Sequence, residues 1–244
     1  SIPLGPPPGR DALPGSQKLP VRGPGLAGSP GLGASSGLAV SPGTGPARGP
    51  LPTRASLYIP ANILVLAWFV AAGIVTLAHR FVPSAGWLMV HLLLLGGVST
   101  AILLWSQHFA ETLTRRPAPG GRRGLWARLL GWCAGVVVIT AGMVHEQGAL
   151  VVAGSAALVA VLIAHLVILQ IQRSGSTQMF GNRFAHLVRY YLAAGALLPL
   201  GIAAGVIMAR VETAPELTGR LYTGHLVATL LGWIGLTVCG TLVL

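Results

Sequence analysis

Apolar residues are gathered into six long runs between residue 57 and the end of the chain, and short segments that carry the charges separate them. The runs cover residues 57–79, 86–110, 125–144, 149–171, 188–209 and 221–244. An α-helix of roughly 20 residues rises about 30 Å, which is the thickness of the hydrocarbon core of a bilayer. The pattern therefore predicts an all-α membrane protein, a bundle of about six transmembrane helices.

Residues 1–56 have a different composition. They hold 12 of the 18 prolines and 12 of the 34 glycines, and they include no aromatic residue. Such a segment cannot bury enough apolar surface to offset the entropy lost on ordering, so we expect a disordered Pro/Gly-rich tail. The chain starts at Ser1 and stops at Leu244 inside an apolar run. We therefore expect the membrane domain, residues 57–244, to be truncated at its C-terminal end.

Composition supports a membrane protein and excludes two other classes. Hydrophobic residues make up 53% of the chain and charged residues 9%, whereas a soluble domain has roughly 25% charged residues. The net charge of +11 would suggest nucleic acid in a soluble protein. Here the cations lie between apolar runs, where they set topology and meet anionic lipid. The expected partner is the lipid bilayer, and no nucleic acid is expected.

The distribution of cations predicts the orientation of the spans. Thirteen Lys and Arg residues lie in the tail and around the connections after the second and fourth runs, and three lie on the opposite side. Because cytoplasmic loops of membrane proteins carry the excess of Lys and Arg, we expect a cytoplasmic N-terminus. The expected location is the plasma (inner) membrane, which the chain crosses several times.

Seven histidines are the unusual feature of a chain with only five acidic residues. Imidazole rarely lies inside a lipid-spanning segment without a partner or ligand, and it is the usual axial ligand of haem and a common ligand of copper. Depth along the runs sorts them into an outer group (His79, His91, His145, His225) and an inner group (His108, His165, His186). We expect His79, His145 and His186 to make interfacial hydrogen bonds at span ends, and His165 to be a partnered core residue.

The remaining three are the candidate haem or metal ligands. His91 and His108 lie 17 residues apart in the second run, which is about 25 Å along a helix, so they cannot share one ion. They could serve two sites stacked across the membrane. His225 is the expected outer partner of His91 because it lies at similar depth. For His108 the inner candidates are His165 and His186, and the sequence leaves both open.

Other chemistry is poorly represented. Cys133 and Cys239 both lie in apolar runs and form no CxxC, so they build neither a disulfide framework nor a cysteine zinc site. The sequence contains no phosphate-binding glycine loop, no paired carboxylates and no Ser/His/Asp arrangement. We expect no catalytic residues, and at most the non-catalytic portion of an enzyme.

Several stretches resemble a known family. The N-terminal membrane region of actinobacterial multicopper oxidases, some of them copper-type nitrite reductases, is similar to WLMVHLLLLGGVSTAILLWSQHFAETL in the second run. Later spans of that region resemble HLVRYYLAAGALLPLGIAAG and LLGWIGLTVCGTLV, and the end of its first span resembles LAHRFVP. The resemblance covers most of residues 57–244. A fainter similarity links the chain to haem–copper membrane proteins of the nitric-oxide response.

The resemblance implies a membrane module of a copper-dependent oxidoreductase in a longer protein, with a cupredoxin domain after further spans. The fainter similarity implies that His91, His108 and His225 ligate haem or copper. In that interpretation the spans pass electrons between the quinone pool and an extracellular copper domain. The alternatives are a cofactor-free membrane anchor or assembly module, or a small transporter.

The cation bias yields the first testable prediction. In a chain whose two native cysteines are replaced by alanine, a single cysteine placed between Arg115 and Arg128 should resist a membrane-impermeant thiol reagent in intact cells. It should react once the membrane is opened, because this loop is expected to be cytoplasmic. Labelling of that cysteine in intact cells would reverse the assigned topology.

Overall fold

The computed structural model describes residues 55–174 and 182–242, and all of the regular structure in these two ranges is helical. Its elements are α1 (Ala55–Leu77), α2 (Ala85–His91), η1 (Leu92–Val98), α3 (Ser99–Thr114), α4 (Gly121–Val144), α5 (Gly148–Ser174), α6 (Asn182–Arg210), α7 (Pro215–Leu226), η2 (Val227–Gly235) and α8 (Leu236–Leu242). The elements η1 and η2 are π-helical. They continue their α-helical neighbours without a break, so α2–η1–α3 and α7–η2–α8 are each one long span.

Six of these helical segments are long and apolar enough to cross a membrane, with mean hydropathies from 1.6 to 2.6. The chain is therefore a multi-pass helical membrane protein, and the predicted fold class is confirmed. The predicted tail, residues 1–56, lies outside the described residues except for the start of α1 at Ala55.

Helix ends differ from the predicted runs by a few residues, and the differences have a common cause. The α4 helix begins at Gly121 rather than at 125, α6 at Asn182 rather than at 188, and the last span at Pro215 rather than at 221. Hydropathy marks only the part of a helix that lies in hydrocarbon, whereas a helix can continue into water. Pro215 suits the first turn of α7 because its ring fixes φ and its missing N–H would have no helical partner there.

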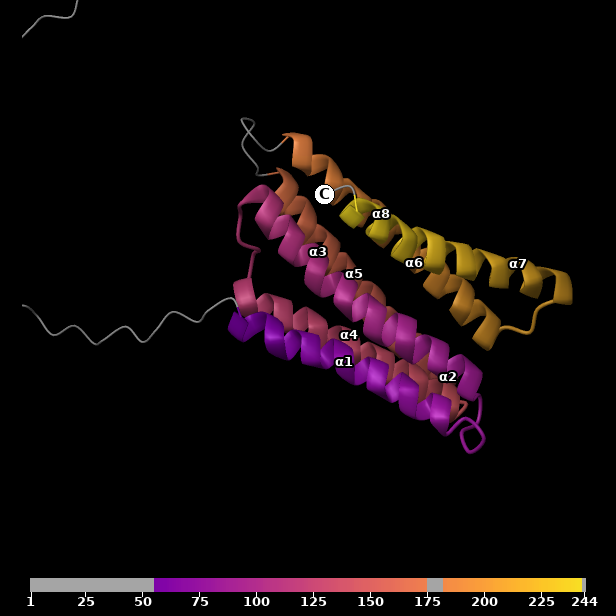
Figure 1. Cartoon of the computed structure of the whole chain (residues 1–244). Helices are drawn as coiled ribbons and strands as arrows, with labels where there is room; N and C mark the ends of the chain where they lie inside the picture. Colours follow the sequence, from indigo (N-terminus) through magenta and orange to yellow (C-terminus); the bar gives the residue numbers. More distant parts are fainter. Residues whose placement is uncertain (1–54, 175–181, 243–244) are drawn as a thin grey trace, which may run out of the picture. The chain divides into compact units, whose positions relative to one another are not determined.

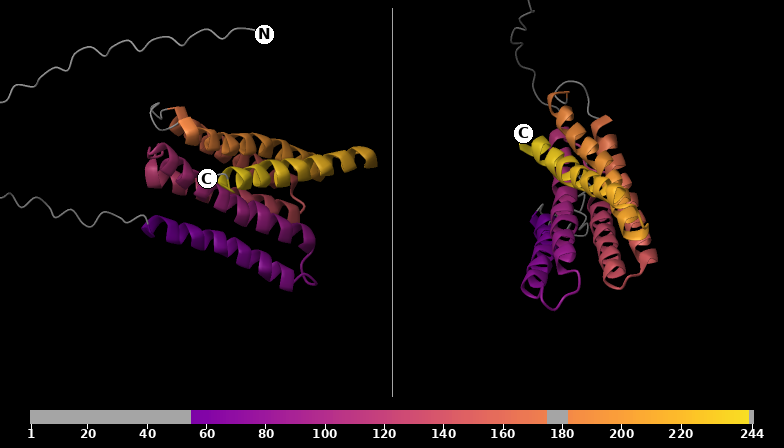
Figure 2. Two further views of the ribbon diagram at one scale, coloured as in Figure 1. Left: turned by 45° about the horizontal axis from the view of Figure 1, so that its top comes forward. Right: turned by 90° about the vertical axis from the view of Figure 1, so that its right-hand side faces the viewer.

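The second and third spans form the centre of the bundle. Of their most apolar windows 44% is buried, against 17% for the first span. The α1 helix lies at one edge and packs mainly on the α2–η1–α3 span, while α6 packs along α7–η2–α8 on the other side (Figures 1 and 2). The core includes Trp132, Leu103, Leu104, Leu129, Leu158, Leu162 and Leu198.

Small residues set the closest helix contact, between α4 and α5. A Cβ built on Gly154 would lie 2.9 Å from both the Gly135 carbonyl oxygen and the Ile139 nitrogen, which are backbone atoms of α4. Gly135 in turn faces Leu158 of α5. Gly135 and Gly154 thus lie where α4 and α5 approach each other closely, as small residues allow between membrane helices.

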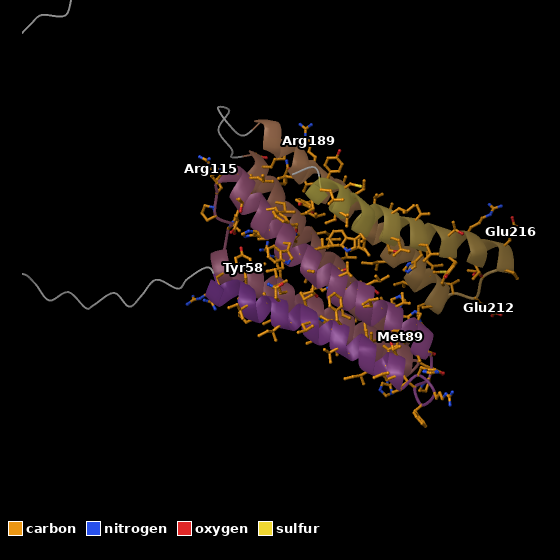
Figure 3. The ribbon with its side chains drawn as sticks, viewed as in Figure 1. Tyr58, Met89, Arg115, Arg189, Glu212 and Glu216 are labelled. Atoms are coloured by element: carbon orange, nitrogen blue, oxygen red, sulfur yellow. The ribbon has the colours of Figure 1, made fainter. Side chains whose placement is uncertain are left out.

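The two ends of the bundle differ in charge, as the labelled side chains of Figure 3 show. Arg115 and Arg189 lie at one end, which we call the arginine-rich end, together with Tyr58. Glu212 and Glu216 lie at the other, which we call the Glu212 end, together with Met89.

Gly154→Ala should destabilise the bundle because the added methyl group meets immovable backbone of α4. We expect a loss of about 1–3 kcal/mol, typical of overpacking, measured as a lower unfolding midpoint in mixed micelles. Gly73→Ala is the matched control, since a Cβ there meets nothing within 4 Å. Equal midpoints for the two variants would show that α4 and α5 do not pack this closely.

Candidate histidine-pair site

His91 is the last residue of α2 and lies half-buried near the Glu212 end. Its Nδ1 lies 2.8 Å from the carbonyl oxygen of Trp87, one turn earlier. A carbonyl can only accept, so Nδ1 carries the proton and donates it. The Trp87 indole stacks on the imidazole, with ring centroids 3.9 Å apart and an angle of 19° between the planes. These two contacts fix both the tautomer and the orientation of the ring.

His225 is held in the same way from the other side. It lies in α7, and its Nδ1 donates to the carbonyl oxygen of Gly201 in α6 at 2.8 Å. Gly205, one turn further along α6, leaves room for the ring: a Cβ there would lie 3.3 Å from Nδ1 and Cε1 of His225. Gly201 and Gly205 together position this imidazole, because the first accepts its hydrogen bond and the second leaves room for its ring.

The structure brings these two histidines together. The ring centroids of His91 and His225 lie 6.3 Å apart and the planes are inclined by 25°. Their equal depth along the second and sixth runs had predicted this proximity. Because each Nδ1–H is taken by a carbonyl, each Nε2 keeps a lone pair for a ligand, the usual arrangement behind a metal-bound histidine.

Both histidines lie next to a π-helical segment, and a direct bond links η2 to the residue that follows η1. The η1 segment begins directly after His91, and η2 begins two residues after His225. The Trp233 indole in η2 donates its N–H to Ser99 Oγ, which follows η1, at 2.9 Å. Ser99 donates its own hydroxyl to the Leu94 carbonyl, five residues earlier, at 2.9 Å. π-Helical turns are rare and are frequent at functional sites.

The pair lines an apolar cavity of about 390 Å³ between the second, third, fourth, fifth and sixth spans. Such a volume and such a lining are typical of small-molecule and cofactor sites. Besides the two histidines, its polar and sulfur-bearing side chains are Trp87, Ser99, Met143, Ser155, Met208, Tyr222, Thr229 and Trp233.

The other candidate ligand, His108, lies elsewhere, near the arginine-rich end. Its Nδ1 is hydrogen-bonded to the Tyr58 hydroxyl at 2.7 Å, and its ring contacts are with Tyr58, Trp105 and Phe109. Of its two proposed partners, His165 is bonded to Ser106 instead, at 2.9 Å, and the side chain of His186 lies outside the described residues.

For the remaining histidines the structure confirms the prediction for His165, while the interfacial hydrogen bonds of His79 and His145 stay a prediction. His165 is buried and has a hydrogen-bond partner, so the prediction of a partnered core residue is confirmed. His79 and His145 are exposed at helix ends. Residues 55–174 and 182–242 contain no group of three or more His, Cys, Asp and Glu side chains that could hold a metal ion.

Comparison of the chain with protein-family models, with curated proteins and with solved structures finds no match.

The bond between Trp233 and Ser99 should couple the two π-helical segments energetically. A double-mutant cycle of Trp233→Phe and Ser99→Ala, followed by unfolding in mixed micelles, should give a coupling energy of about 1 kcal/mol. The control cycle pairs Ser99→Ala with Trp132→Phe, whose indole N–H donates to the Leu95 carbonyl instead. That cycle should be nearly additive. Equal coupling in both cycles would contradict a specific bond across the cavity.

Proposed function

We propose that the helical domain is a membrane electron-transfer module that binds one haem between His91 and His225. The observation that carries the proposal is the pair itself: two imidazoles from separate spans lie side by side in an apolar cavity, each with Nδ1 tied to a carbonyl. Burying two such groups in hydrocarbon is costly unless they have a task or a partner.

The separation of the rings suits one ion held between them. A metal–nitrogen bond is about 2 Å long and a ring nitrogen lies about 1 Å from its ring centre, so two imidazoles that bound one ion from opposite sides would have centroids roughly 6 Å apart. The observed separation is 6.3 Å. The carbonyls of Trp87 and Gly201 then increase the basicity of both rings, as second-shell acceptors do.

The donor set favours haem over a bare copper ion. A haem brings four nitrogen ligands of its own and needs only axial ligands from the protein. No third histidine, cysteine or carboxylate joins the pair within the described ranges. Copper would have to recruit Met143 or Met208, whose thioethers line the same cavity and suit Cu(I). We therefore propose haem as the cofactor of the histidine pair and copper as the alternative.

The cavity supplies what an electron carrier needs around it. Its apolar lining excludes water and gives the low-dielectric surroundings that tune a redox potential. When bound, the haem supplies reversible one-electron transfer.

The partners we propose follow from the resemblance to multicopper oxidase membrane regions and from the cation bias. The module lies in the plasma membrane with its N-terminus in the cytoplasm, so that the histidine pair is on the extracellular side. It exchanges electrons between the quinone pool and a cupredoxin domain in a longer chain. His108 has Tyr58 as its partner and is not part of this site.

His91→Ala and His225→Ala should each abolish the absorption and electron paramagnetic resonance signals of a six-coordinate, low-spin haem in the purified protein. The double variant should lose no more than either single one, because residues that act as a unit are not additive. His108→Ala is the matched control and should keep the signal, since about 25 Å of helix separates it from His91.

Three other outcomes would overturn the proposal. Copper without haem in the purified protein would point to the His and Met ligands. No cofactor, after expression with adequate haem, would favour the anchor or assembly interpretation. A haem signal that survives in His225→Ala but is lost in His108→Ala would place the cofactor site near His108, at the arginine-rich end.

A further inference from the structure

A second group of buried polar side chains lies in the arginine-rich half of the bundle and has no part in the histidine pair. Its members come from α3, α4 and α5 and are all at most 6% exposed: Ser106, Gln107, Arg128, His165 and Gln172. A buried guanidinium among membrane spans is rare and is a functional-site candidate by default.

Gln107 is the hub of this polar cluster. Its carbonyl oxygen accepts from Arg128 Nη2 at 3.2 Å. Its amide nitrogen donates to Gln172 Oε1 at 2.9 Å and to Glu111 Oε1 at 3.3 Å. The Gln107 amide thus links the buried cation of Arg128 in α4 to the half-buried carboxylate of Glu111, which lies in α3 like Gln107 itself. Glu111 is thus the carboxylate that this chain of hydrogen bonds connects to Arg128.

The cluster nevertheless has polar atoms that no protein group satisfies. In the described part of the chain, the buried side-chain nitrogen and oxygen atoms without a hydrogen-bond partner are Nε and Nη1 of Arg128 and Nδ1 of His165. The other ring nitrogen of His165 is bonded to Ser106. Buried polar atoms are nearly always satisfied by protein or by ordered water. Nε and Nη1 of Arg128 can only donate, whereas Nδ1 of His165 can donate or accept, so water, which does both, can satisfy each of these atoms.

The hydrogen bonds also show where the cluster meets the surface. Glu111 accepts from the backbone N–H of Ala118 at 3.2 Å, and Gln172 donates to the Arg116 carbonyl at 3.0 Å. The Ala118 N–H and the Arg116 carbonyl both belong to the turn between α3 and α4 at the arginine-rich end. The polar side chains therefore continue from this turn into the bundle.

The inner end of the cluster is closed by apolar side chains. Leu162 and Leu158 precede His165 by about one and two turns of α5, toward the Glu212 end, and both are fully buried. Leu158 also lines the histidine-pair cavity. About 10 Å of apolar packing thus separates His165 from that cavity.

We propose that these five side chains form a hydrated inlet through which water, and with it protons, reaches His165 from the arginine-rich end. Glu111 stands at the entrance, Arg128 and Gln107 hold the water, and His165 is the last polar group. With Nε2 bonded to Ser106, Nδ1 is the ring nitrogen that remains to hydrogen-bond this water and to exchange a proton with it. The inlet is independent of what the histidine pair binds.

Water-edited solid-state NMR on the full chain in lipid bilayers, labelled with ¹⁵N at histidine and tryptophan, tests the inlet. Magnetisation from mobile water should reach the His165 ring several-fold faster than the indole N–H of Trp132. Trp132 is equally buried but is bonded to the Leu95 carbonyl, so it is the dry reference. The variants His165→Gln and Trp132→Phe assign the two signals. Equal, slow transfer to both groups would show that the cluster is a dry structural contact.

Arg128→Met should then reduce the transfer from water to His165 to the level of Trp132, because it removes the two donors that hold the water. Arg123→Met, an exposed position on the same helix, should leave the transfer unchanged. If the Arg128→Met protein folds and magnetisation still passes from water to His165 at the wild-type rate, the proposed inlet is wrong. The wild-type measurement decides the question by itself if that variant does not fold.

Discussion

Everything inside the bundle depends on one constraint: in hydrocarbon, a polar group has no water to bond and must find its partner within the protein. Many polar side chains of the spans find their hydrogen-bond partner within their own helix. Thr100, Thr140 and Thr237 each donate to the carbonyl four residues earlier. Other polar groups bond between spans, among them His225 of the histidine pair and the side chains of the Arg128 cluster. Both proposals of function concern these two places.

The π-helical segments are subject to the same constraint, because their backbone carbonyls also need hydrogen-bond donors within the protein. A π-turn displaces carbonyls from their usual α-helical partners, and here other side chains use them. Trp132 donates to the Leu95 carbonyl at 3.0 Å, and Ser99 to the Leu94 carbonyl at 2.9 Å. Ser99 also accepts from Trp233, so the two unusual segments support one another across the cavity. This cross-link keeps the two histidine-bearing spans in register while the space between them stays open.

The sequence predicts the spans and part of the site. Runs of apolar residues as long as the bilayer is thick can be read directly, and depth along two such runs placed His91 beside His225. The burial of Arg128 was not predicted, because its position suggested another cation of the neighbouring loop, whereas the structure buries its side chain. The role of Gln107 as the hub of this cluster was not predicted either, because an uncharged side chain does not stand out in the sequence. The bond between His108 and Tyr58 was missed because Tyr58 lies at the start of α1, next to the tail. Depth orders residues along the membrane normal, but it does not tell which spans are neighbours.

The most direct test of the central claim is a haem titration of the purified full chain, followed by its Soret absorption. Two axial imidazoles on one ion predict saturation at one haem per chain, with the spectrum of a six-coordinate, low-spin iron. Saturation at two haems would mean that His108 also belongs to a cofactor site. The absence of any specific binding would contradict the electron-transfer module itself.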